Sequence, residues 1–494
     1  MERTAAAAAG SVAWQPWSAA AFARARAERA PVLLHIGAAW CQWSERMSRT
    51  TYRDPAVCRL VERAFVPVRV DADRRPDINE RYNLGGWPTT VFLTPAGGLL
   101  GGETYVDAAR MTALLERVAE AFARRRDEVD APRTTPPAGR SSDPPASGRD
   151  LDGWLEQHLL ERFDPQHGGF GTAPKHVHAG AVRFALRRSG AAGGRLREAA
   201  SRTLDALGWG GLYDDVGGGV FRYCAASDWT APHVEKLLAV NASVLDLLLE
   251  GSVVLGEPRY RERAAHLLRY VVGTLADRAA GGFFASQHAD PGYYATPAAE
   301  RDRLTGPPVD RSVYAAGTAR MAGALLRAAE VFGDSSLLEF AATSLERVAG
   351  ETYERGGGVA HAVGDGESAR GLLADQVAVS DALLDLHEAT ERDVYLDLAQ
   401  ELMRFCLRAL WDAGRGGFVD RVVAKDDVGL LREPLRPFAV NCTAVRVLAR
   451  LDRLTGRDDF RERAAATLAS LLPGARRRGV DAAPWALAAM ELAD

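Results

Sequence analysis

Between residues 11 and 126, short apolar runs of strand length alternate with segments of helical pattern. The predicted strands are 31–36, 65–70, 89–93 and 99–104. Helices are predicted to begin at Cys41 and at Ala108. Strands that alternate with helices over such a short stretch predict a small α/β domain with one central sheet.

Residues 151–494 show almost no strand pattern and instead carry about twelve segments with apolar residues at i, i+3, i+4 spacing. Their approximate starting residues are 151, 178, 195, 233, 257, 312, 335, 371, 393, 436, 457 and 482. Glycine-rich turns of one kind separate pairs of them, at 164–170, 213–221, 281–284, 356–359 and 411–418. Repeated helical hairpins cannot bury their apolar faces alone, so neighbours must stack. This pattern predicts closure into an all-α (α/α)6 toroid with the turns at one mouth, and an open solenoid is the alternative.

The two regions are separated by residues 127–150, which contain five prolines, no aromatic residue and one large aliphatic residue, Val129. Such a stretch cannot bury enough surface to fold, so it is predicted to be an extended linker. We therefore expect a thioredoxin-sized domain over 11–126, a linker over 127–150 and the toroid over 151–494.

Charge and cysteine content narrow the classes of function. The 494-residue chain carries 61 basic and 65 acidic residues, a balance that lacks the clustered positive charge of a nucleic-acid-binding protein. The most apolar long stretch, Leu237 to Gly256, carries Asn241, Asp246 and Glu250, so it indicates a buried helix and not a membrane span. The N-terminus is a poor secretory signal, and the five cysteines lack metal-ligand spacing. We expect a cytoplasmic protein without a metal or cofactor.

A candidate thiol site lies in the first region. Cys41 follows the first strand at a predicted helix start, where the helix dipole favours a thiolate. Trp87-Pro88 opens a later strand, at the place where thioredoxin-like folds have a cis-proline that faces the cysteine. A dithiol oxidoreductase needs a second cysteine three residues on, and position 44 is serine. Cys41 could hold mixed disulfides with a thiol-bearing protein or small thiol, could have another reactive role, or could be a relic in a binding fold.

The glycine-rich turns concentrate unusual chemistry. Only three lysines occur among the 61 basic residues, and Lys175 and Lys236 each lie within three residues of a histidine, His176 and His233. Pro232 is predicted to open a helix, on which His233 and Lys236 would share a face. Because a lysine amine titrates and a guanidinium does not, both lysines are candidates for chemistry.

Other turns add carboxylates and aromatic rings, for which turn capping and core packing are the alternative explanations. We predict a catalytic set and a ligand-binding set. The catalytic set is Cys41, Asp214, Asp215, His233, Glu235 and Lys236. The ligand-binding set is Trp87, Pro88, Lys175, His176, Arg222, Tyr223, Trp229, Asn241, His288, Asp290 and Asp375, with His361 and Gln376 nearby. Aromatic faces beside carboxylates suit a sugar, since carboxylate pairs hydrolyse glycosides and histidine pairs can move a proton next to a carbonyl.

Several strings, in this order, resemble one family nearly from end to end. They are Val12-Ala-Trp-Gln-Pro-Trp17, Gly85-Gly-Trp-Pro88, Ala173-Pro-Lys175, Gly217-Gly-Gly219, Arg222-Tyr223 and Pro232-His-Val-Glu-Lys236. The chain resembles the spermatogenesis-associated, bacterial YyaL-type family, which joins a thioredoxin-like domain of unknown function to a six-hairpin glycosidase-like toroid. The resemblance implies that architecture and leaves the substrate open.

This chain departs from the family pattern at four motifs. Cys41-Gln42-Trp43-Ser44-Glu45 stands where the family has Cys-His-Trp-Cys-His, and Ala239-Val240-Asn241 where it has Tyr-Asp-Asn. Gln287-His288-Ala289-Asp290 replaces Glu-Asp-Ala-Asp, and Ala315 to Thr318 replace Ser-Trp-Asn-Gly. The departures indicate a divergent or partly degenerate member.

Three hypotheses follow. The first is a toroid that binds or processes a carbohydrate-like ligand beside a monothiol redox or recruiting domain. The second is an isomerase of the acylglucosamine-epimerase kind that uses two of His176, His233, His288 and His361. The third is a non-catalytic scaffold or chaperone-like binder with two silenced sites.

Overall fold

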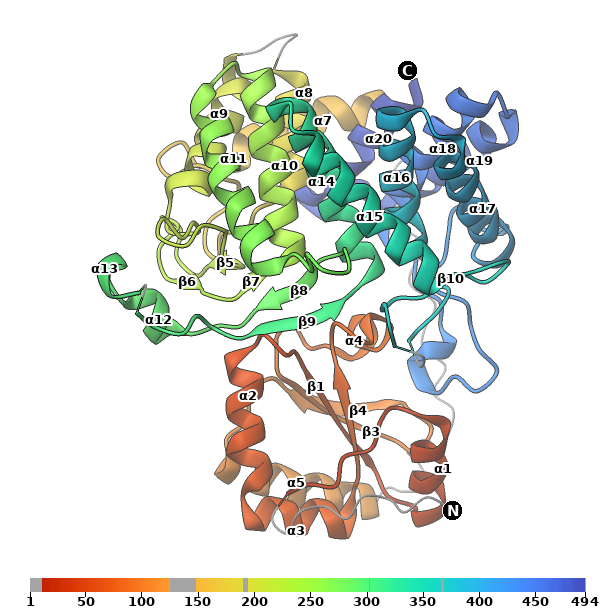
Figure 1. The fold of residues 1–494 in the computed structure, drawn as a ribbon. Coiled ribbons are helices and arrows are strands. Elements are labelled where there is room, and N and C mark those ends of the chain that lie inside the picture. Colours follow the sequence, from red (N-terminus) through yellow and green to blue (C-terminus); the bar gives the residue numbers. More distant parts are fainter. Residues whose placement is uncertain (1–10, 125–147, 190–193, 302, 366–367, 494) are drawn as a thin grey trace. The chain divides into compact units, whose positions relative to one another are not determined.

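The computed structural model describes residues 11–124, 148–189, 194–301, 303–365 and 368–493 (Figure 1). The chain forms two compact units. Unit 1 comprises residues 1–139 and 423–434, and unit 2 comprises residues 140–422 and 435–494. Most of the predicted linker, 127–150, lies outside the described residues. The predicted domain boundaries therefore stay a prediction.

Unit 1 is built on a four-stranded sheet in the order β2-β1-β3-β4. The strands are β1 (Val32–Gly37), β2 (Val66–Asp71), β3 (Thr89–Leu93) and β4 (Leu99–Glu103). β1 pairs parallel with β2 and antiparallel with β3, and β4 pairs antiparallel with β3. Every residue of β1 and β3 is buried, which explains why both strands are mainly apolar, although His35, Thr89 and Thr90 are buried with them. The sheet confirms the predicted α/β domain.

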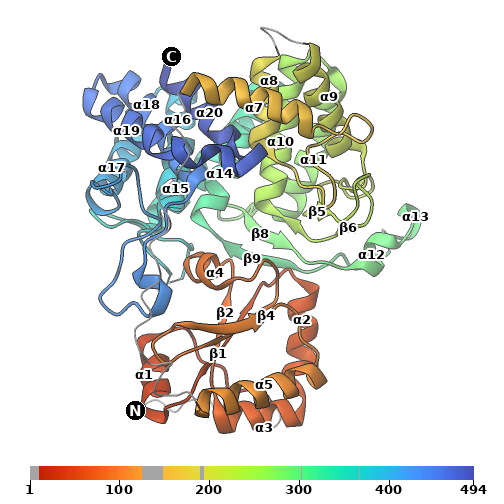
Figure 2. The same ribbon diagram turned by 180° about the vertical axis from the view of Figure 1, so that it is seen from behind.

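Within the described residues of unit 1, five α-helices accompany this sheet: α1 (Ala19–Glu28), α2 (Gln42–Arg49), α3 (Pro55–Ala64), α4 (Pro76–Tyr82) and α5 (Ala108–Arg124). α3 begins at a proline whose preceding residue, Asp54, accepts the backbone N–H groups of Ala56 and Val57. Val61 of α3 and Leu115 of α5 share a core with Leu33 of β1. Figures 1 and 2 show α3 and α5 side by side next to the sheet.

Unit 2 contains twelve long helices among its described residues, in two concentric sets. The inner set is α8 (Ala179–Arg188), α10 (Leu238–Val254), α14 (Ala315–Phe332), α16 (Leu373–Thr390), α18 (Phe438–Thr455) and α20 (Ala483–Ala493). The outer set is α7 (Gly148–Arg162), α9 (Gly194–Trp209), α11 (Pro258–Tyr270), α15 (Ser335–Thr352), α17 (Asp393–Ala409) and α19 (Asp458–Ala475). Each inner helix contacts the next, and α20 contacts α8, which closes the ring. The predicted (α/α)6 toroid is confirmed and the open solenoid is wrong.

Short strands and helices lie between the long helices of unit 2. They are β5 (Tyr223–Cys224), β6 (Pro232–His233), β7 (Lys236–Leu237), β8 (Phe284–Gln287), α12 (Pro291–Ala295), α13 (Ala298–Arg301), β9 (Val309–Val313), β10 (Tyr353–Glu354) and β11 (Gly358–Val359). β7, β8 and β9 form one antiparallel sheet in that order. These segments precede the N-terminal ends of α10, α14 and α16, which defines the turn end of the ring.

One prediction about these segments is wrong. His233 and Lys236 do not share a helix face, because α10 begins at Leu238. Tyr223 of β5 pairs with His233, and Lys236 of β7 pairs with Gln287 of β8. The backbone hydrogen bonds of these pairings hold the segment extended, and two-residue strands leave no periodic pattern in the sequence.

Four of the glycine-rich turns have the same backbone hydrogen bonds. The turns begin at Asp164, Asp214, Asp277 and Asp412. In each, the aspartate N–H donates to the glycine carbonyl five positions later, and the glycine N–H four positions later donates to the aspartate carbonyl, at 2.8 to 3.0 Å. Gly219 shows why glycine is needed, since a Cβ there would lie 2.5 Å from the ring of Tyr270. The repeated sequence pattern is therefore a repeated backbone structure.

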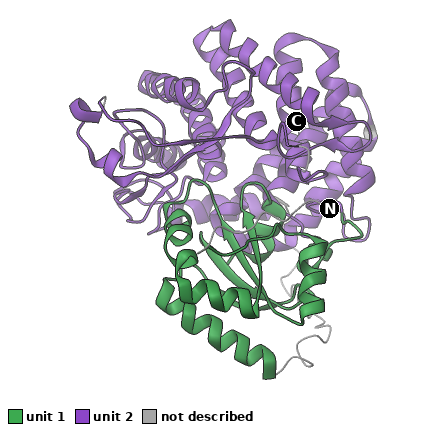
Figure 3. Cartoon of the chain, turned by 60° about the horizontal axis from the view of Figure 1, so that its bottom comes forward, with its two compact units in different colours: residues 1–139, 423–434 green, residues 140–422, 435–494 purple. Residues whose placement is uncertain are grey.

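A short segment far along the chain completes unit 1. Residues 423–434 belong to this unit, as the green segment of Figure 3 shows. The Tyr82 hydroxyl donates to the Gly97 carbonyl and accepts from the Leu430 N–H, both at 2.8 Å. Arg81 donates to the carbonyls of Leu430 and Glu433, also at 2.8 Å. The sequence analysis assigned this segment to the toroid.

Candidate functional site

The candidate thiol of unit 1 lies where the sequence places it. Cys41 is the residue that precedes α2, and its side chain is buried. Its thiol donates to the carbonyl of Trp87, with 3.3 Å between Sγ and O. The Trp87–Pro88 peptide bond is cis, as predicted. The rings of Trp40 and Trp87 meet edge to face beside it, and the Trp40 indole N–H donates to Asp73. A protein backbone and two indoles therefore surround the sulfur.

Residue 44 is a serine, so it supplies no second thiol. Ser44 is buried in the first turn of α2, and its hydroxyl oxygen accepts the backbone N–H of Ala38 at 3.4 Å. The other cysteine of the unit, Cys58, lies in α3, where its thiol donates to the Tyr52 carbonyl. Burial and the charge of Asp54 raise the pKa of Cys58 above its ordinary value. Cys41 thus has no partner three residues away, and Cys58 is poorly suited to nucleophilic attack.

Both candidate lysines of unit 2 are buried and paired. Lys175 donates to the Asp164 carboxylate at 2.9 Å and to the Gly168 carbonyl at 2.8 Å. Lys236 makes the same two bonds in the next glycine-rich turn, to Asp214 at 2.7 Å and to the Gly218 carbonyl. Burial lowers the pKa of Lys236 to about 8. Each lysine therefore bridges the first and fifth residues of its glycine-rich turn.

Arginine bridges one other turn in the same way, and in a fourth turn it bonds the glycine carbonyl. Arg347 donates to Asp277 and to the Gly281 carbonyl, and Arg436 donates to the Gly416 carbonyl. A cation on the glycine carbonyl is thus a repeated feature of the ring. These contacts favour a structural role for the lysines, whereas the sequence analysis assigned them chemistry.

The adjacent aspartates Asp214 and Asp215 have different surroundings. Asp214 is buried between Lys236 and Arg301, whose guanidinium lies 2.6 Å from the carboxylate. Burial alone would raise the pKa of Asp214, but these two cations hold it below the ordinary value. Asp215 is exposed and pairs with Arg263 of the outer helix α11. The two carboxylates therefore do not form a catalytic pair.

Five of the predicted residues do meet in one cluster, which we call the His233 cluster: His176, Arg222, Tyr223, His233 and Glu235. The ring of Tyr223 stacks on His176 on one side and on His233 on the other, with centroids 5.0 and 4.2 Å apart. Arg222 pairs with Glu235 at 3.0 Å. Burial lowers the pKa of both histidines, so both imidazoles are neutral at pH 7. Neutral imidazoles can accept protons.

A second pair, His361 and Asp375, lies at the start of α16. Both side chains are buried, and His361 Nδ1 lies 3.0 and 3.1 Å from the two Asp375 oxygens. Asp375 also accepts the N–H of Ala316, in the first turn of α14. Because an ionised carboxylate can only accept, the pair fixes the imidazole proton on Nδ1. The ring of Tyr314 stacks on His361 with centroids 4.8 Å apart.

The remaining predicted residues serve the turns or lie elsewhere. The buried indole of Trp229 donates to the Gly168 carbonyl, and the buried Asn241 amide bonds both backbone groups of Val220. Gln376 does the same for Val359. Asp290 caps α12, and the backbone N–H of His288 donates to the Pro308 carbonyl. The structure gathers neither Asp290 nor His288 into the two histidine clusters.

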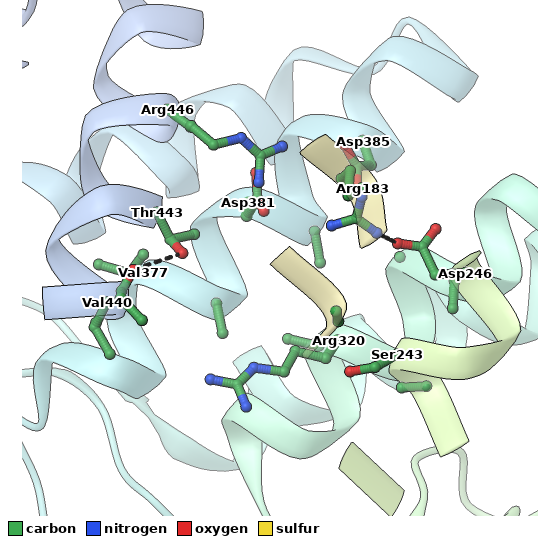
Figure 4. Close-up of a pocket in the computed structure, with 18 of the residues that line it drawn as sticks. Arg183, Ser243, Asp246, Arg320, Val377, Asp381, Asp385, Val440, Thr443 and Arg446 are labelled. Carbon is green, nitrogen blue, oxygen red and sulfur yellow. Dashed lines mark hydrogen bonds and ion pairs between the residues drawn. The ribbon is translucent and has the colours of Figure 1, made fainter. Parts of the chain in front are cut away.

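Sequence reasoning missed a cavity between the inner helices of unit 2. It has a volume of about 290 Å³ and runs along the axis of the ring, between α8, α10, α14, α16 and α18 (Figure 4). Eight alanines and one glycine leave it open: Ala179, Ala242, Ala319, Gly323, Ala324, Ala374, Ala378, Ala382 and Ala439. Eight charged residues also line it: Arg183, Arg187, Asp246, Arg320, Arg327, Asp381, Asp385 and Arg446.

Both histidine clusters lie at the same end of the ring as the alanine-lined part of this cavity. His178, which directly precedes the lining residue Ala179, meets the ring of His176 edge to face. Asp375 directly follows the lining residue Ala374. The turn end of the ring thus has the buried His361, the half-buried His233 and the exposed His176 at the same end as a polar cavity.

Comparison with known proteins finds matches to the chain, beginning with its first region. Residues 4–135 match a family model described as a protein of unknown function, DUF255, named Thioredox_DsbH. Over 307 residues the chain is 30% identical to spermatogenesis-associated protein 20 of Mus musculus, a match covering 56% of this chain and 39% of the relative. The resemblance to the spermatogenesis-associated family is confirmed.

The match to an uncharacterised protein of Caenorhabditis elegans is 26% identical over 305 residues and covers 41% of that relative. The chain spans about two fifths of the length of these two relatives.

Solved structures match the toroid. Cellobiose 2-epimerase from Spirochaeta thermophila superposes with a TM-score of 0.52 at 17% identity, covering 65% of this chain and 84% of the epimerase. A D-mannose isomerase gives 0.52 at 13% identity, covering 66% of this chain and 87% of the isomerase. At these identities the likeness shows the (α/α)6 fold alone.

Two negative findings complete the description. Among the described residues, no helix is both long and apolar enough to cross a membrane. Within the same residues, no group of three or more His, Cys, Asp or Glu side chains could hold a metal ion.

Proposed function

We propose that the toroid binds a small carbohydrate-like ligand in the axial cavity, with the histidines of the turn end beside it. The observation that carries this proposal is the cavity itself. Inner helices of a closed ring normally fill their axis with side chains, as protein interiors are close-packed. Here alanines and glycine leave about 290 Å³, which suits a small ligand.

Two further observations support a sugar. The cellobiose 2-epimerase and the D-mannose isomerase that share this fold are named for reactions of sugars. The lining is also rich in charged groups that can bind hydroxyls, and ionisable hydrogen-bonding groups hold sugars in orientation.

The histidines favour an isomerase as the more specific reaction, and the hydrolase is the second candidate. An epimerisation next to a carbonyl needs a base that removes a proton from carbon and an acid that returns one. His361 is held in one tautomer by Asp375, and His176 and His233 are neutral imidazoles at the same end of the ring. Solvent deuterium that enters a sugar carbon during turnover supports this reaction, and turnover without exchange contradicts it.

The binding proposal is tested by calorimetry and thermal shift on the full chain with a panel of aldoses, ketoses, N-acetylhexosamines and uronates. We expect at least one sugar to stabilise the protein, and His361→Gln to weaken its binding. His387→Gln is the matched control, because His387 lies in the last turn of α16, at the opposite end from Asp375, where it contacts the Arg392 carbonyl. A panel without any stabilising sugar, or equal binding by the two variants, contradicts the proposal.

For unit 1 we propose that Cys41 forms mixed disulfides. The Cys41 thiolate attacks a disulfide R–S–S–R′, a Cys41–S–S–R bond forms, and R′–S⁻ leaves, so that the electrons balance. Because Ser44 cannot attack this bond, a second external thiol must release R. After incubation with oxidised glutathione, intact-mass spectrometry should find one glutathione on the protein and none on Cys41→Ser. Equal modification of Cys41→Ser, through Cys58, would contradict this role.

A further inference from the structure

The charges that line the axial cavity are unequal in number and in pairing. Five arginines and three aspartates are among its lining residues. Asp246 pairs with Arg183 and Arg327, while Asp381 and Asp385 both pair with Arg450. All three lining carboxylates are therefore already engaged by arginine.

Glu250, behind the lining, engages two of the same arginines. Its carboxylate lies 2.9 Å from Arg183 and 3.0 Å from Arg187. Among the described residues, the ion pair of Arg446 is a long one, 3.9 Å from Glu491. Arg450, behind the lining, serves Asp381, Asp385 and Glu388 at once, so the charges around the cavity are paired unevenly.

Arg320 is the arginine that stays without a partner. It lies in the second turn of α14 and makes no hydrogen bond or ion pair with any residue that the structure describes. In Figure 4 a dashed line joins Arg183 to Asp246, and none ends on Arg320. Its side chain is exposed although α14 is an inner helix, because it faces the open cavity. Surrounding protein lowers the pKa of Arg320, and Asp375 acts in the opposite direction.

A guanidinium in this position is a strong anion site. It presents five N–H donors in a planar fork that matches two oxygens of a carboxylate or phosphate. The Arg320 side chain is exposed to the cavity, so water can reach its donors in the empty protein and an anionic group can take the place of that water. The surplus of arginine adds a favourable field for the same charge.

The lining also lacks the groups that recognise a neutral sugar by its apolar face. Among the lining residues of the described chain none is aromatic, and the largest apolar side chains are Val377 and Val440. Tyr223 and Tyr314 lie with the histidines of the turn end and stack on imidazole rings. Affinity in the cavity must therefore come from charge and hydrogen bonds.

From these observations we infer that the ligand of the toroid is an acidic sugar, whose carboxylate or phosphate group is bound by the guanidinium of Arg320. The inference rests on the proposed function and deepens it, because it names the class of substrate for the same cavity. The chemistry shared by the two sources is an oxyanion on a small polyhydroxylated body.

The experiment is isothermal titration of the full chain with matched sets of sugars. Glucose, glucuronate and glucose 6-phosphate form one set, the corresponding mannose and galactose compounds form two more, and sodium phosphate is titrated alone. We expect one of the acidic sugars to bind and its neutral parent to bind at least tenfold more weakly. Arg320→Met should reduce the affinity by roughly 10- to 100-fold, as for other charged hydrogen bonds.

Two further variants test whether the loss of affinity comes from the guanidinium of Arg320. Arg320→Lys keeps the charge without the fork, so it should recover part of the affinity if the anion is bound there. Arg408→Met removes an exposed arginine of the outer helix α17 and should bind like the parent chain. The melting temperature of each variant without ligand shows whether it is folded.

The outcomes separate this inference from the proposed function. Neutral and acidic sugars that bind equally well, with Arg320→Met unaffected, overturn the acidic class and leave the sugar-binding proposal standing. Sodium phosphate that binds as tightly as any sugar phosphate overturns the sugar part of the inference. A complete absence of sugar binding overturns both proposals.

Discussion

The turn end of the ring and its axis use polar residues in opposite ways. At the turns, Lys175, Lys236, Asp214 and Asn241 are buried, and each already bonds a backbone group or a counter-charge of the protein. On the axis, Arg320 has no such partner and faces an open cavity. The comparison teaches that unusual polar residues in a sequence mark two different needs. The polar groups of a repeated turn bond one another and the backbone, whereas the proposed binding site has a guanidinium that can bind a ligand.

The largest effect should come from the buried charges of the second turn. Asp214→Asn leaves Lys236 and Arg301 without their shared counter-charge, so we expect it to lower the free energy of unfolding by about 3–5 kcal/mol. Asp215→Asn is the control. Its side chain is 65% exposed, so we expect a cost of about 1 kcal/mol or less. Urea unfolding followed by far-ultraviolet circular dichroism compares them. Equal costs would mean that the turn does not depend on this ion pair.

A loss of stability of intermediate size is expected when the side chain that holds a turn is removed, and the loss should differ between a turn held by asparagine and one held by serine. Asn441→Ala removes hydrogen bonds to the N–H and the carbonyl of Phe418, which are buried, so we expect a loss of about 2–3 kcal/mol. Ser344→Ala removes one bond to the Gly282 N–H and should cost about 1 kcal/mol. The same unfolding experiment ranks them. A reversed ranking would show that the turns are not equivalent structures.

Unit 1 offers a buried polar group that can be tested by pH. Burial, aided by Arg69, lowers the pKa of His35 to about 3, and its Nε2 has no hydrogen-bond partner in the described structure. Below pH 6.5 His35 is protonated in the unfolded chain but stays neutral in the folded unit, so the folded unit loses stability as the pH falls. Between pH 7 and pH 5 the expected loss is about 2 kcal/mol.

Hydrogen exchange of the β1 amides, corrected for intrinsic rates, measures this loss in the full chain. His35→Gln should remove most of the dependence, because glutamine does not titrate in this range. A parent chain whose β1 protection is the same at both pH values would contradict the prediction.

The smallest change in stability is expected for a variant that gains the ability to form a disulfide. Ser44→Cys replaces one oxygen by sulfur beside the weak 3.4 Å contact with Ala38, so the expected change in stability is within about 1 kcal/mol. The variant should form a disulfide with Cys41 under mild oxidation, seen as the loss of two hydrogens by intact-mass spectrometry. A variant that stays reduced would show that residue 44 cannot reach Cys41.

Local pattern predicted the long helices well, because each carries many apolar positions. Helices expected to begin near 335 and 393 begin at Ser335 and Asp393. The segment around His233 was predicted wrongly, because two-residue strands are set by their partners and carry no periodicity. The thiol site could be predicted because it depends on one residue at a helix start.

The cavity could not be predicted by the same reasoning. All but three of the 61 basic residues are arginine, so Arg320 does not stand out in the sequence. What distinguishes it is the missing partner, which depends on five helices from distant parts of the chain. One available signal was a charged residue within an otherwise apolar helix. Asp246 showed it in α10, and it pairs with the lining residues Arg183 and Arg327.

The late segment of unit 1 has a consequence for the order of synthesis. Tyr82 and Arg81 are made early, yet their partners Leu430 and Glu433 are made about 350 residues later, which takes roughly 18 to 70 s at the ribosome. During that interval the nascent unit lacks these hydrogen bonds. A ribosome stalled before residue 423 should therefore hold a unit 1 that is more easily cut by protease than the same unit in the released chain.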